Sequence, residues 1–196
     1  MSILNLLTTE EINKYIRFKY YDSNQVVFNE GSICSGIGIV IEGEILIKTY
    51  TYNVKEETIT VIKEKNFFGQ YLLFSSNNTY LGLGVTTRKT KVAYISKNNL
   101  LTLLSNSKSF LEAYMKVICD EAVKIKQQAK LLAHKNIRDR IMYYLITKQK
   151  DKKVYIKSVT NLSNILSIPR PSVSRELSNM ETEGLIKKEK KYIIIK

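Results

Sequence analysis

Cysteine and histidine are nearly absent from this sequence. Its 196 residues include two cysteines, Cys34 and Cys119, and one histidine, His134. Neither cysteine belongs to a CxxC pair, so a disulfide framework, a zinc site and a four-cysteine iron–sulfur cluster are all unsupported. A metal-dependent enzyme with a β-barrel of the cupin type needs several histidine and acidic ligands, which one histidine does not supply. We therefore expect a non-enzyme with no catalytic residues and no metal site.

Long hydrophobic runs are also missing. No apolar run reaches the roughly 18 residues that a membrane-spanning helix needs. The N-terminus, MSILNLLTTEEINKY, has no basic segment and becomes acidic early, unlike a secretory signal peptide. The sequence therefore predicts a cytoplasmic protein with no membrane partner.

Acidic residues are few compared with basic ones. The chain carries 31 Lys and Arg against 18 Asp and Glu, a formal net charge of +13. Residues 135–196 hold 15 of the basic residues and only 6 of the acidic ones. A basic excess confined to one part of a chain favours a polyanionic partner such as double-stranded DNA. A general compositional bias toward lysine, asparagine and isoleucine is the alternative explanation.

Short β segments dominate the first half of the chain. A short helix over 8–16, capped by Thr8 or Thr9, precedes them. Seven of the eight glycines lie in this half, where turns follow one another about every ten residues, a pattern typical of a β-barrel or β-sandwich. The expected fold class is α+β, with an N-terminal β-roll of the jelly-roll or double-stranded β-helix kind. The predicted strands cover residues 25–28, 38–41, 44–52, 57–62 and 91–95.

A long helix is predicted from about residue 108 to 133. Its apolar positions are spaced 4, 3, 4, 3, 4 and 3 residues apart, the heptad pattern of a helix that pairs with another helix. A helix packed only on its own β domain is the alternative, but it usually shows a wider apolar stripe. The predicted dimer interface consists of Leu111, Met115, Ile118, Ala122, Ile125, Ala129 and Leu132.

The last 60 residues suggest a DNA-reading unit. An amphipathic helix over 136–149 and a short strand over 154–156 lead to two small helices joined by the turn Ser167-Ile168-Pro169. The second helix starts near Arg170 and stops at Gly184, and a hairpin over 185–195 follows. This is the order of a winged helix-turn-helix, whose second helix enters the DNA major groove.

The candidate DNA contacts lie on that second helix and on the hairpin. Arginine suits bidentate contact with guanine, serine can reach bases or phosphates, and hairpin lysines contribute affinity without sequence information. A surface ion pair is the alternative for the arginine at 175, and an ordinary solvated turn is the alternative for the lysines. The candidates are Arg170, Ser172, Ser174, Arg175, Ser178, Lys187 and Lys188.

Three stretches carry a resemblance to a known family. They are GIVIEGEILI at 38–47, NFFGQYLLF at 66–74 and IPRPSVSRELSNMETEGLI at 168–186. With its β-rich part, long helix and winged helix-turn-helix in that order, the chain resembles the Crp/Fnr family of bacterial transcription regulators. The resemblance implies a homodimer on a roughly palindromic site, an effector pocket in the β-roll and RNA polymerase as a further partner. It also implies control by movement of the DNA-binding domains about the long helix.

The recognition helix departs from the family at one position. Arg170 and Arg175 match the arginines of the common Arg-Glu-x-x-x-Arg pattern, but Pro171 stands where the glutamate would be. A carboxylate that accepts from a cytosine amino group is therefore missing. We expect the DNA site to differ from that of the best-known members.

The effector pocket departs further. The resemblance implies that a Gly-Glu pair takes the ribose hydroxyl of a cyclic nucleotide and that an Arg-Ser pair about ten residues later takes its phosphate. The candidates here are Gly69, Gln70, Tyr80 and Leu81, so the arginine is missing, and Arg88 replaces it only if the loop is threaded differently. Losing such a charge-assisted contact costs roughly 1.5–3 kcal/mol. We expect no cyclic AMP binding, and any effector is of unknown identity.

The sequence lacks the ligands for the haem group or iron–sulfur cluster that the resemblance to the family would allow. There are two cysteines rather than four, and His134 falls at the end of the long helix, where a helix-end or dimer contact is expected. Cys34 as a redox thiol remains an alternative. No cofactor is predicted.

The sequence thus predicts three parts and one main function. Residues 1–107 form the β-roll sensor, 108–134 the dimerisation helix and 135–196 the DNA-binding domain. The predicted function is a homodimeric, sequence-specific transcription regulator that reads a palindromic site through the helix at about 170–183. A small-molecule-binding signalling module without DNA binding is the alternative.

Overall fold

The computed structural model describes residues 3–50 and 56–196, and the chain forms two compact units. The first unit is Met1–Cys119 and the second is Asp120–Lys196, so the division falls inside one long helix. The three-part division at residues 107 and 134 stays a prediction.

Two short helices open the first unit, a 3-10 turn η1 (Ile3–Leu6) and α1 (Thr9–Tyr15). The Thr8 hydroxyl accepts from the Glu11 N–H at 3.2 Å, and the Glu11 carboxylate accepts from the Thr8 N–H at 2.9 Å. This reciprocal capping box satisfies two donors that have no partner inside the helix. The predicted helix over 8–16, capped by a threonine, is confirmed.

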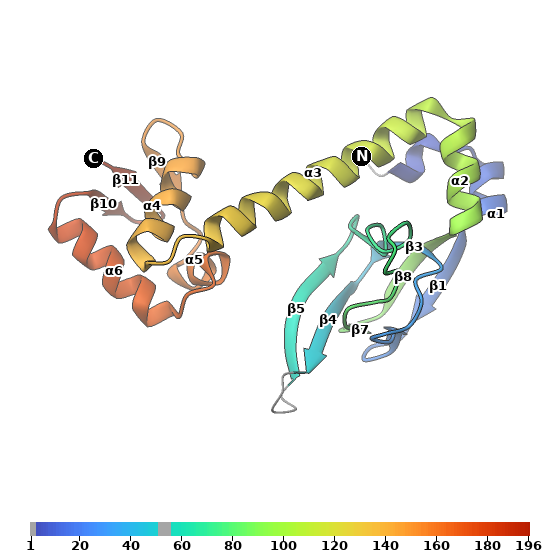
Figure 1. Ribbon diagram of the computed structural model, residues 1–196, viewed down its shortest axis with the longest axis horizontal. Coiled ribbons are helices and arrows are strands. Elements are labelled where there is room, and N and C mark those ends of the chain that lie inside the picture. The colour runs from blue at the N-terminus through green and yellow to red at the C-terminus, as the bar shows by residue number, and fades with distance from the viewer. Residues whose placement is uncertain (1–2, 51–55) are drawn as a thin grey trace. The chain divides into compact units, whose positions relative to one another are not determined.

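Two four-stranded antiparallel sheets form the body of the first unit (Figure 1). The first has the order β1 (Arg17–Tyr21), β8 (Thr90–Ser96), β3 (Gly36–Glu42), β6 (Phe67–Phe68). The second has the order β2 (Val26–Phe28), β7 (Leu83–Thr86), β4 (Glu44–Tyr50), β5 (Glu56–Lys63). Apolar side chains from both sheets share one core, among them Ile37, Ile39, Ile45, Val92 and Ile95.

All five predicted strands are present, as β2, β3, β4, β5 and β8. The prediction for β4 ran to residue 52, and residues 51 and 52 lie outside the described residues. Three strands were missed because their sequences carry little pattern: β1 (RFKYY) is almost fully exposed, β6 has two residues, and β7 (LGVT) contains a glycine. The α+β class with antiparallel sheets is confirmed.

Two helices follow the sheets, α2 (Lys97–Asn106) and α3 (Lys108–Leu132). The structure places α3 within one residue of its predicted bounds, whereas α2 was not predicted. Figure 1 shows α1 and α2 at the same end of the first unit, where the Asn99 side chain donates to the Tyr15 carbonyl at 2.8 Å. Among the described residues, no helix combines the length and apolar character needed to cross a bilayer.

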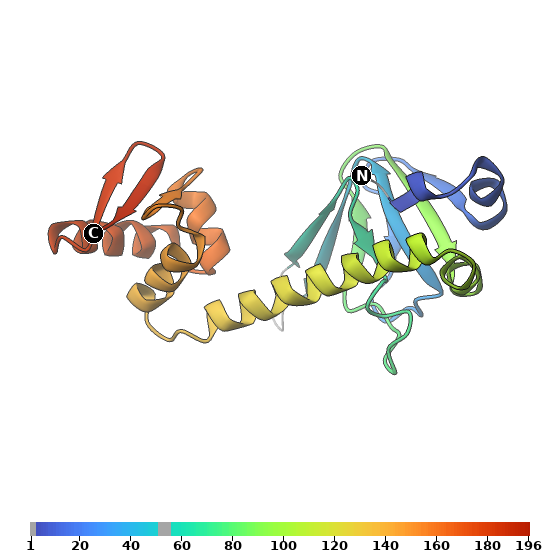
Figure 2. The same cartoon turned by 90° about the horizontal axis from the view of Figure 1, so that it is seen from above.

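The second unit contains three helices after α3 and a three-stranded sheet (Figure 2). Every element lies within about two residues of its prediction. A separate core holds the unit together, with Ile141, Leu145, Leu162, Leu166, Val173 and Met180 fully buried. The elements are α4 (Ile137–Lys148), β9 (Lys153–Tyr155), α5 (Val159–Leu166), α6 (Arg170–Thr182), β10 (Ile186–Glu189) and β11 (Tyr192–Ile195), with sheet order β10–β11–β9.

Candidate nucleic-acid interface and effector pocket

A tight turn connects α5 to α6. The Ser158 hydroxyl caps α5 by accepting from the Asn161 N–H at 3.0 Å, and Ser167 ends it in the left-handed conformation, with φ 52°. Pro169 is the N-cap of α6 and makes no side-chain capping hydrogen bond, whereas Pro171 lies in the first turn, where the missing N–H has no helical partner to lose. Gly184 follows α6 with φ 75°, a conformation that favours glycine. Local chemistry therefore fixes both ends of α6.

One face of α6 is buried and the remaining faces meet solvent. Val173, Leu177 and Met180 recur at helical spacing and fill the core of the second unit. Four of the five α6 residues predicted to contact DNA are exposed, namely Arg170, Ser174, Arg175 and Ser178. Ser172 is half-buried, which leaves it less able to reach a ligand.

The two arginines of α6 have no partner for their side chains. Among the described residues, neither Arg170 nor Arg175 makes a side-chain hydrogen bond, an ion pair or a ring contact. The surface ion pair considered for Arg175 is therefore not formed, because Glu176 binds elsewhere. Two exposed guanidinium groups on one helix are suited to an anionic partner.

The predicted lysine contacts pair with glutamates of the same unit. Lys187 Nζ lies 2.6 Å from Glu189 Oε1, and Lys188 Nζ lies 2.8 Å from Glu181 Oε2. The Lys188 hydrogen bond holds the pKa of the Glu181 carboxyl below its ordinary value. Lys188 also donates to the Ser178 hydroxyl at 3.2 Å, so that hydroxyl is already engaged.

The turn between β10 and β11 leaves two other lysines free. Lys190 and Lys191 make no ion pair among the residues that the structure describes. They are exposed, and Lys190 adopts φ 46° in the turn. Of the four lysines in this hairpin, these two are the better placed for phosphate contact.

Sequence reasoning missed two arginines of α4. Arg138 binds Glu176 and Glu183 of the second unit with three hydrogen bonds of 2.6–2.7 Å. Glu183 first, and then Glu176, raise the pKa of Arg138 above its ordinary value. Arg140 donates to the carbonyls of Leu132, His134 and Leu166, which end α3 and α5. The available signal for Arg138 was the seven-residue spacing of the two glutamates, which places them on one face of a helix.

Most heptad positions of α3 are not the positions through which this helix packs on the first unit. Phe110, Tyr114 and Val117 contact the core of that unit, and none of them belongs to the predicted seam. Among the seam residues only Ile118 contacts the same core. The other six are exposed in the isolated chain: Leu111, Met115, Ala122, Ile125, Ala129 and Leu132.

The effector candidates lie in the segment between β6 and β7 of the first unit. Gly69 has φ 80°, and a Cβ there would lie 2.7 Å from the Gly36 carbonyl and 3.4 Å from the Tyr80 hydroxyl. Gln70 and Tyr80 are buried, whereas Leu81 is 68% exposed. The structure thus brings Gly69 and Tyr80 together and leaves Leu81 facing solvent.

Tyr80, predicted from the sequence to correspond to the family's phosphate-binding arginine, lies in an aromatic stack. The Tyr80 ring stacks on Phe28, with centroids 4.0 Å apart and an angle of 14°. Burial first, and then a hydrogen bond with Cys34, raise the pKa of the Tyr80 phenol far above its ordinary value. Tyr80 is therefore uncharged, and Arg88 lies instead in the β7–β8 turn, 3.8 Å from Glu64.

Cys34 is buried beside the same loop. Its thiol donates to the Gly36 carbonyl at 3.2 Å and to the Gly69 carbonyl at 3.5 Å. Tyr114 of α3 is also buried; its hydroxyl has no hydrogen-bond partner among the described residues, and burial raises its pKa to about 12. The thiol is closed off from solvent, which disfavours fast oxidation.

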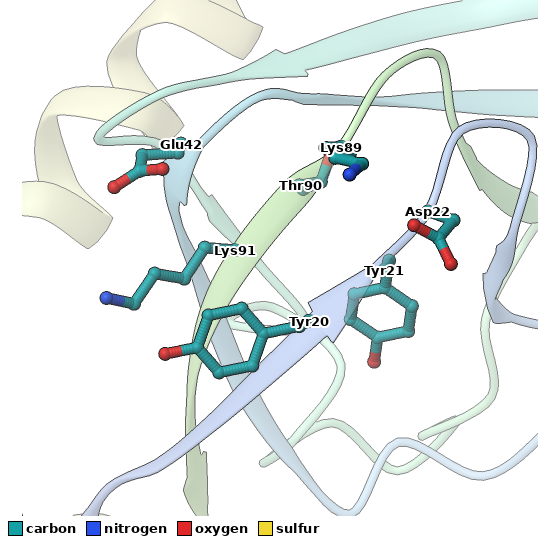
Figure 3. A pocket seen from close by; sticks show the side chains of 7 residues that line it. All are labelled: Tyr20, Tyr21, Asp22, Glu42, Lys89, Thr90 and Lys91. Atoms are coloured by element: carbon teal, nitrogen blue, oxygen red, sulfur yellow. The ribbon is translucent and has the colours of Figure 1, made fainter.

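The described part of the first unit contains one pocket beside the effector candidates and another away from them. One of about 280 Å³ has Phe28, Phe68 and Tyr80 among its walls, so it reaches an effector candidate. The other, of about 370 Å³, lies over β1 and β8 and includes none of the effector candidates. Figure 3 shows the side chains of Tyr20 and Lys91 next to each other at this second pocket, with Lys91 Nζ 5.5 Å from the Tyr20 ring centroid.

The described residues contain no group of three His, Cys, Asp or Glu side chains placed to hold a metal ion.

Residues 18–107 match the family model of the cyclic nucleotide-binding domain. This stretch begins in β1 and ends after α2, so it includes both sheets. No curated protein matches the chain.

Three solved regulators share the fold of the chain. The catabolite activator protein of Thermus thermophilus is 16% identical, with 99% of this chain and 93% of that chain covered and a TM-score of 0.57. The c-di-GMP responsive global regulator CLP of Xanthomonas campestris is 20% identical, with 95% and 96% covered and a TM-score of 0.56. A variant of CooA from Carboxydothermus hydrogenoformans is 15% identical, with 100% and 91% covered and a TM-score of 0.64. At these identities the likeness establishes the fold.

Proposed function

We propose that the chain is a sequence-specific DNA-binding transcription regulator of the Crp/Fnr type and that α6 reads the DNA. The observation that carries this proposal is the pair of exposed arginines on α6, Arg170 and Arg175, whose side chains have no partner among the described residues. They follow a tight helix-helix turn in the part of the chain with the largest excess of basic residues. Helix-turn-helix units present the first turns of their second helix to base edges in this way.

The proposal includes a homodimer formed through α3. Six of the seven seam residues are exposed in the isolated chain, although four of them are large and apolar. A second copy of the same helix, paired in parallel with the first, buries this seam. Two copies of α6 then read a palindromic site with half-sites about 34–36 Å apart, one turn of B-DNA. RNA polymerase as a further partner stays a prediction.

A selection from random DNA sequences tests this function. The purified protein is expected to enrich an inverted repeat whose half-sites lie about 10–10.5 base pairs apart, centre to centre. Running the selection with and without cell extract shows whether an effector is required. If neither condition enriches any sequence, the chain does not read DNA and the signalling module becomes the better interpretation.

The proposed sensor does not bind cyclic AMP. The phosphate of a cyclic nucleotide needs a cation or several donors, and the residue at the arginine position is the neutral, buried Tyr80. The nearby cation Arg88 faces Glu64 in another turn. Any effector of this chain is thus recognised by chemistry other than that of a cyclic phosphate.

Cyclic AMP and cyclic GMP are therefore expected to leave the melting temperature unchanged to within about 1 °C in a thermal-shift assay. A ligand present at 100 times its Kd stabilises a protein by about 2.7 kcal/mol, which raises the melting temperature of a domain this size by several degrees. Such a rise with either nucleotide contradicts the pocket assignment.

A further inference from the structure

The helix proposed to read DNA carries more negative than positive charge. From Arg170 to Glu183 the chain has two arginines and three glutamates, Glu176, Glu181 and Glu183. Carboxylates near DNA phosphates repel them, and a like-charge juxtaposition costs affinity. Neighbouring elements must therefore neutralise these glutamates if α6 is to lie in a DNA groove.

Arg138 of α4 neutralises two of the three. Its Nε donates to Glu176 Oε1 at 2.6 Å, and its two terminal nitrogens donate to the two carboxylate oxygens of Glu183, at 2.7 Å each. The two glutamates are two helical turns apart on one flank of α6. A single planar guanidinium therefore binds two glutamates that lie two helical turns apart. One lysine ammonium cannot reproduce this geometry.

Lys188 of β10 neutralises the third. Its Nζ lies 2.8 Å from Glu181 Oε2, and its backbone N–H donates to Glu181 Oε1 at 2.8 Å. The α6 helix is thus held from α4 by one cation and from the hairpin by another. The DNA-facing arginines remain outside both sets of contacts.

We infer that Arg138 is a positioning residue for DNA reading and that it acts through Glu176 and Glu183. This inference rests on the proposed function. The bidentate contact fixes the rotation of α6 about its axis, and hence the direction in which Arg175 points. The same contact neutralises the negative charges of the Glu176 and Glu183 carboxylates beside the surface proposed to face DNA.

A double-mutant cycle tests the inference. Arg138→Ala is expected to weaken binding to the selected DNA site about tenfold in the wild-type background. In a Glu176→Gln and Glu183→Gln background the same change is expected to cost less than about twofold, because the charges that Arg138 offsets are gone. Arg138→Lys is expected to recover only part of the affinity. Equal losses in both backgrounds, or no loss in either, overturn the inference.

Lys108→Ala is the matched control. Lys108 pairs with Glu112 across one turn of α3, so this change also removes one cation from an exposed ion pair, but at a distance from α6 along the chain. It is expected to leave affinity for the selected site within about twofold of wild type. Cooperative urea unfolding of each variant checks that it is folded.

A second readout needs no DNA. Amide hydrogen exchange of residues 172–182 is expected to rise in Arg138→Ala and to stay unchanged in Lys108→Ala, because α6 loses a contact that spans two turns in the first variant only. Unchanged exchange in Arg138→Ala contradicts the positioning role. If the wild-type protein reads no DNA, the proposed function fails, and the exchange result still shows whether Arg138 holds α6.

Discussion

Arg175→Ala is expected to weaken binding to the selected DNA site far more than binding to unrelated DNA. Arg175 is exposed on α6, away from the buried stripe of Val173, Leu177 and Met180, and its guanidinium has no partner in the part of the chain that the structure describes. A bidentate contact to guanine discriminates against other bases by about 1–3 kcal/mol. A symmetric dimer loses that contact in both half-sites. Fluorescence anisotropy with the selected and a scrambled duplex measures both affinities.

Lys190→Ala is the control for that experiment. Lys190 lies exposed in the β10–β11 turn without an ion pair among the described residues, a position suited to a phosphate. Its removal is expected to weaken binding to both duplexes alike and to lower the salt slope by about 1. If Arg175→Ala also lowers both affinities equally, Arg175 contacts only the backbone, and sequence reading must come from other residues.

Ile125→Asp is expected to convert the dimer into a monomer. Ile125 belongs to the heptad seam, is 59% exposed in the isolated chain and contacts neither core. Each dimer loses two isoleucines, worth about 1.5–3 kcal/mol apiece when buried, and gains two carboxylates that face each other. Ile118 is less suitable for this test, because it also packs on the first unit. Sedimentation velocity measures the mass in solution.

Val123→Asp is the matched control for Ile125→Asp. Val123 is 55% exposed on the same helix but stands outside the seam. Its replacement is expected to leave the dimer intact, because the added charge faces water. A persistent dimer in Ile125→Asp places the interface elsewhere on the chain, and loss of the dimer in both variants means that the contact is broader than the heptad seam.

The elements with strong local signals were predictable from sequence. The long helix, the α5–turn–α6 unit and five strands have apolar periodicity, capping residues or turn residues that act over a few positions. The strand β1 was missed because its five residues are almost all exposed, so that pairing with β8, more than 70 residues away, alone makes it a strand. Helix α2, with two asparagines in its first turn, has a weak propensity of its own.

The contacts that position the candidate sites were not predictable. Arg138 and Arg140 lie on α4, and their partners are on other elements, up to 45 residues away. The spacing of Glu176 and Glu183 places both on one face of a helix, but it does not show which cation of another element binds them. The same holds for Lys188, predicted to contact DNA, which the structure pairs with Glu181, and for Tyr80, which stacks on a phenylalanine from another strand. Sequence patterns therefore identified the segments that form the candidate sites. Tertiary contacts decide which side chains in those segments remain available to bind a ligand.

The salt dependence of binding to the selected DNA is the sharpest test of whether the chain reads DNA sequence. Specific affinity is to be measured by anisotropy at several salt concentrations, with the selected palindrome, a single half-site and a scrambled duplex. We expect the tightest binding to the palindrome, a steep linear fall of log affinity with log salt, and a preference over scrambled DNA of about 10³-fold or more. Equal affinity for the three duplexes at every salt concentration contradicts sequence-specific DNA binding by this chain.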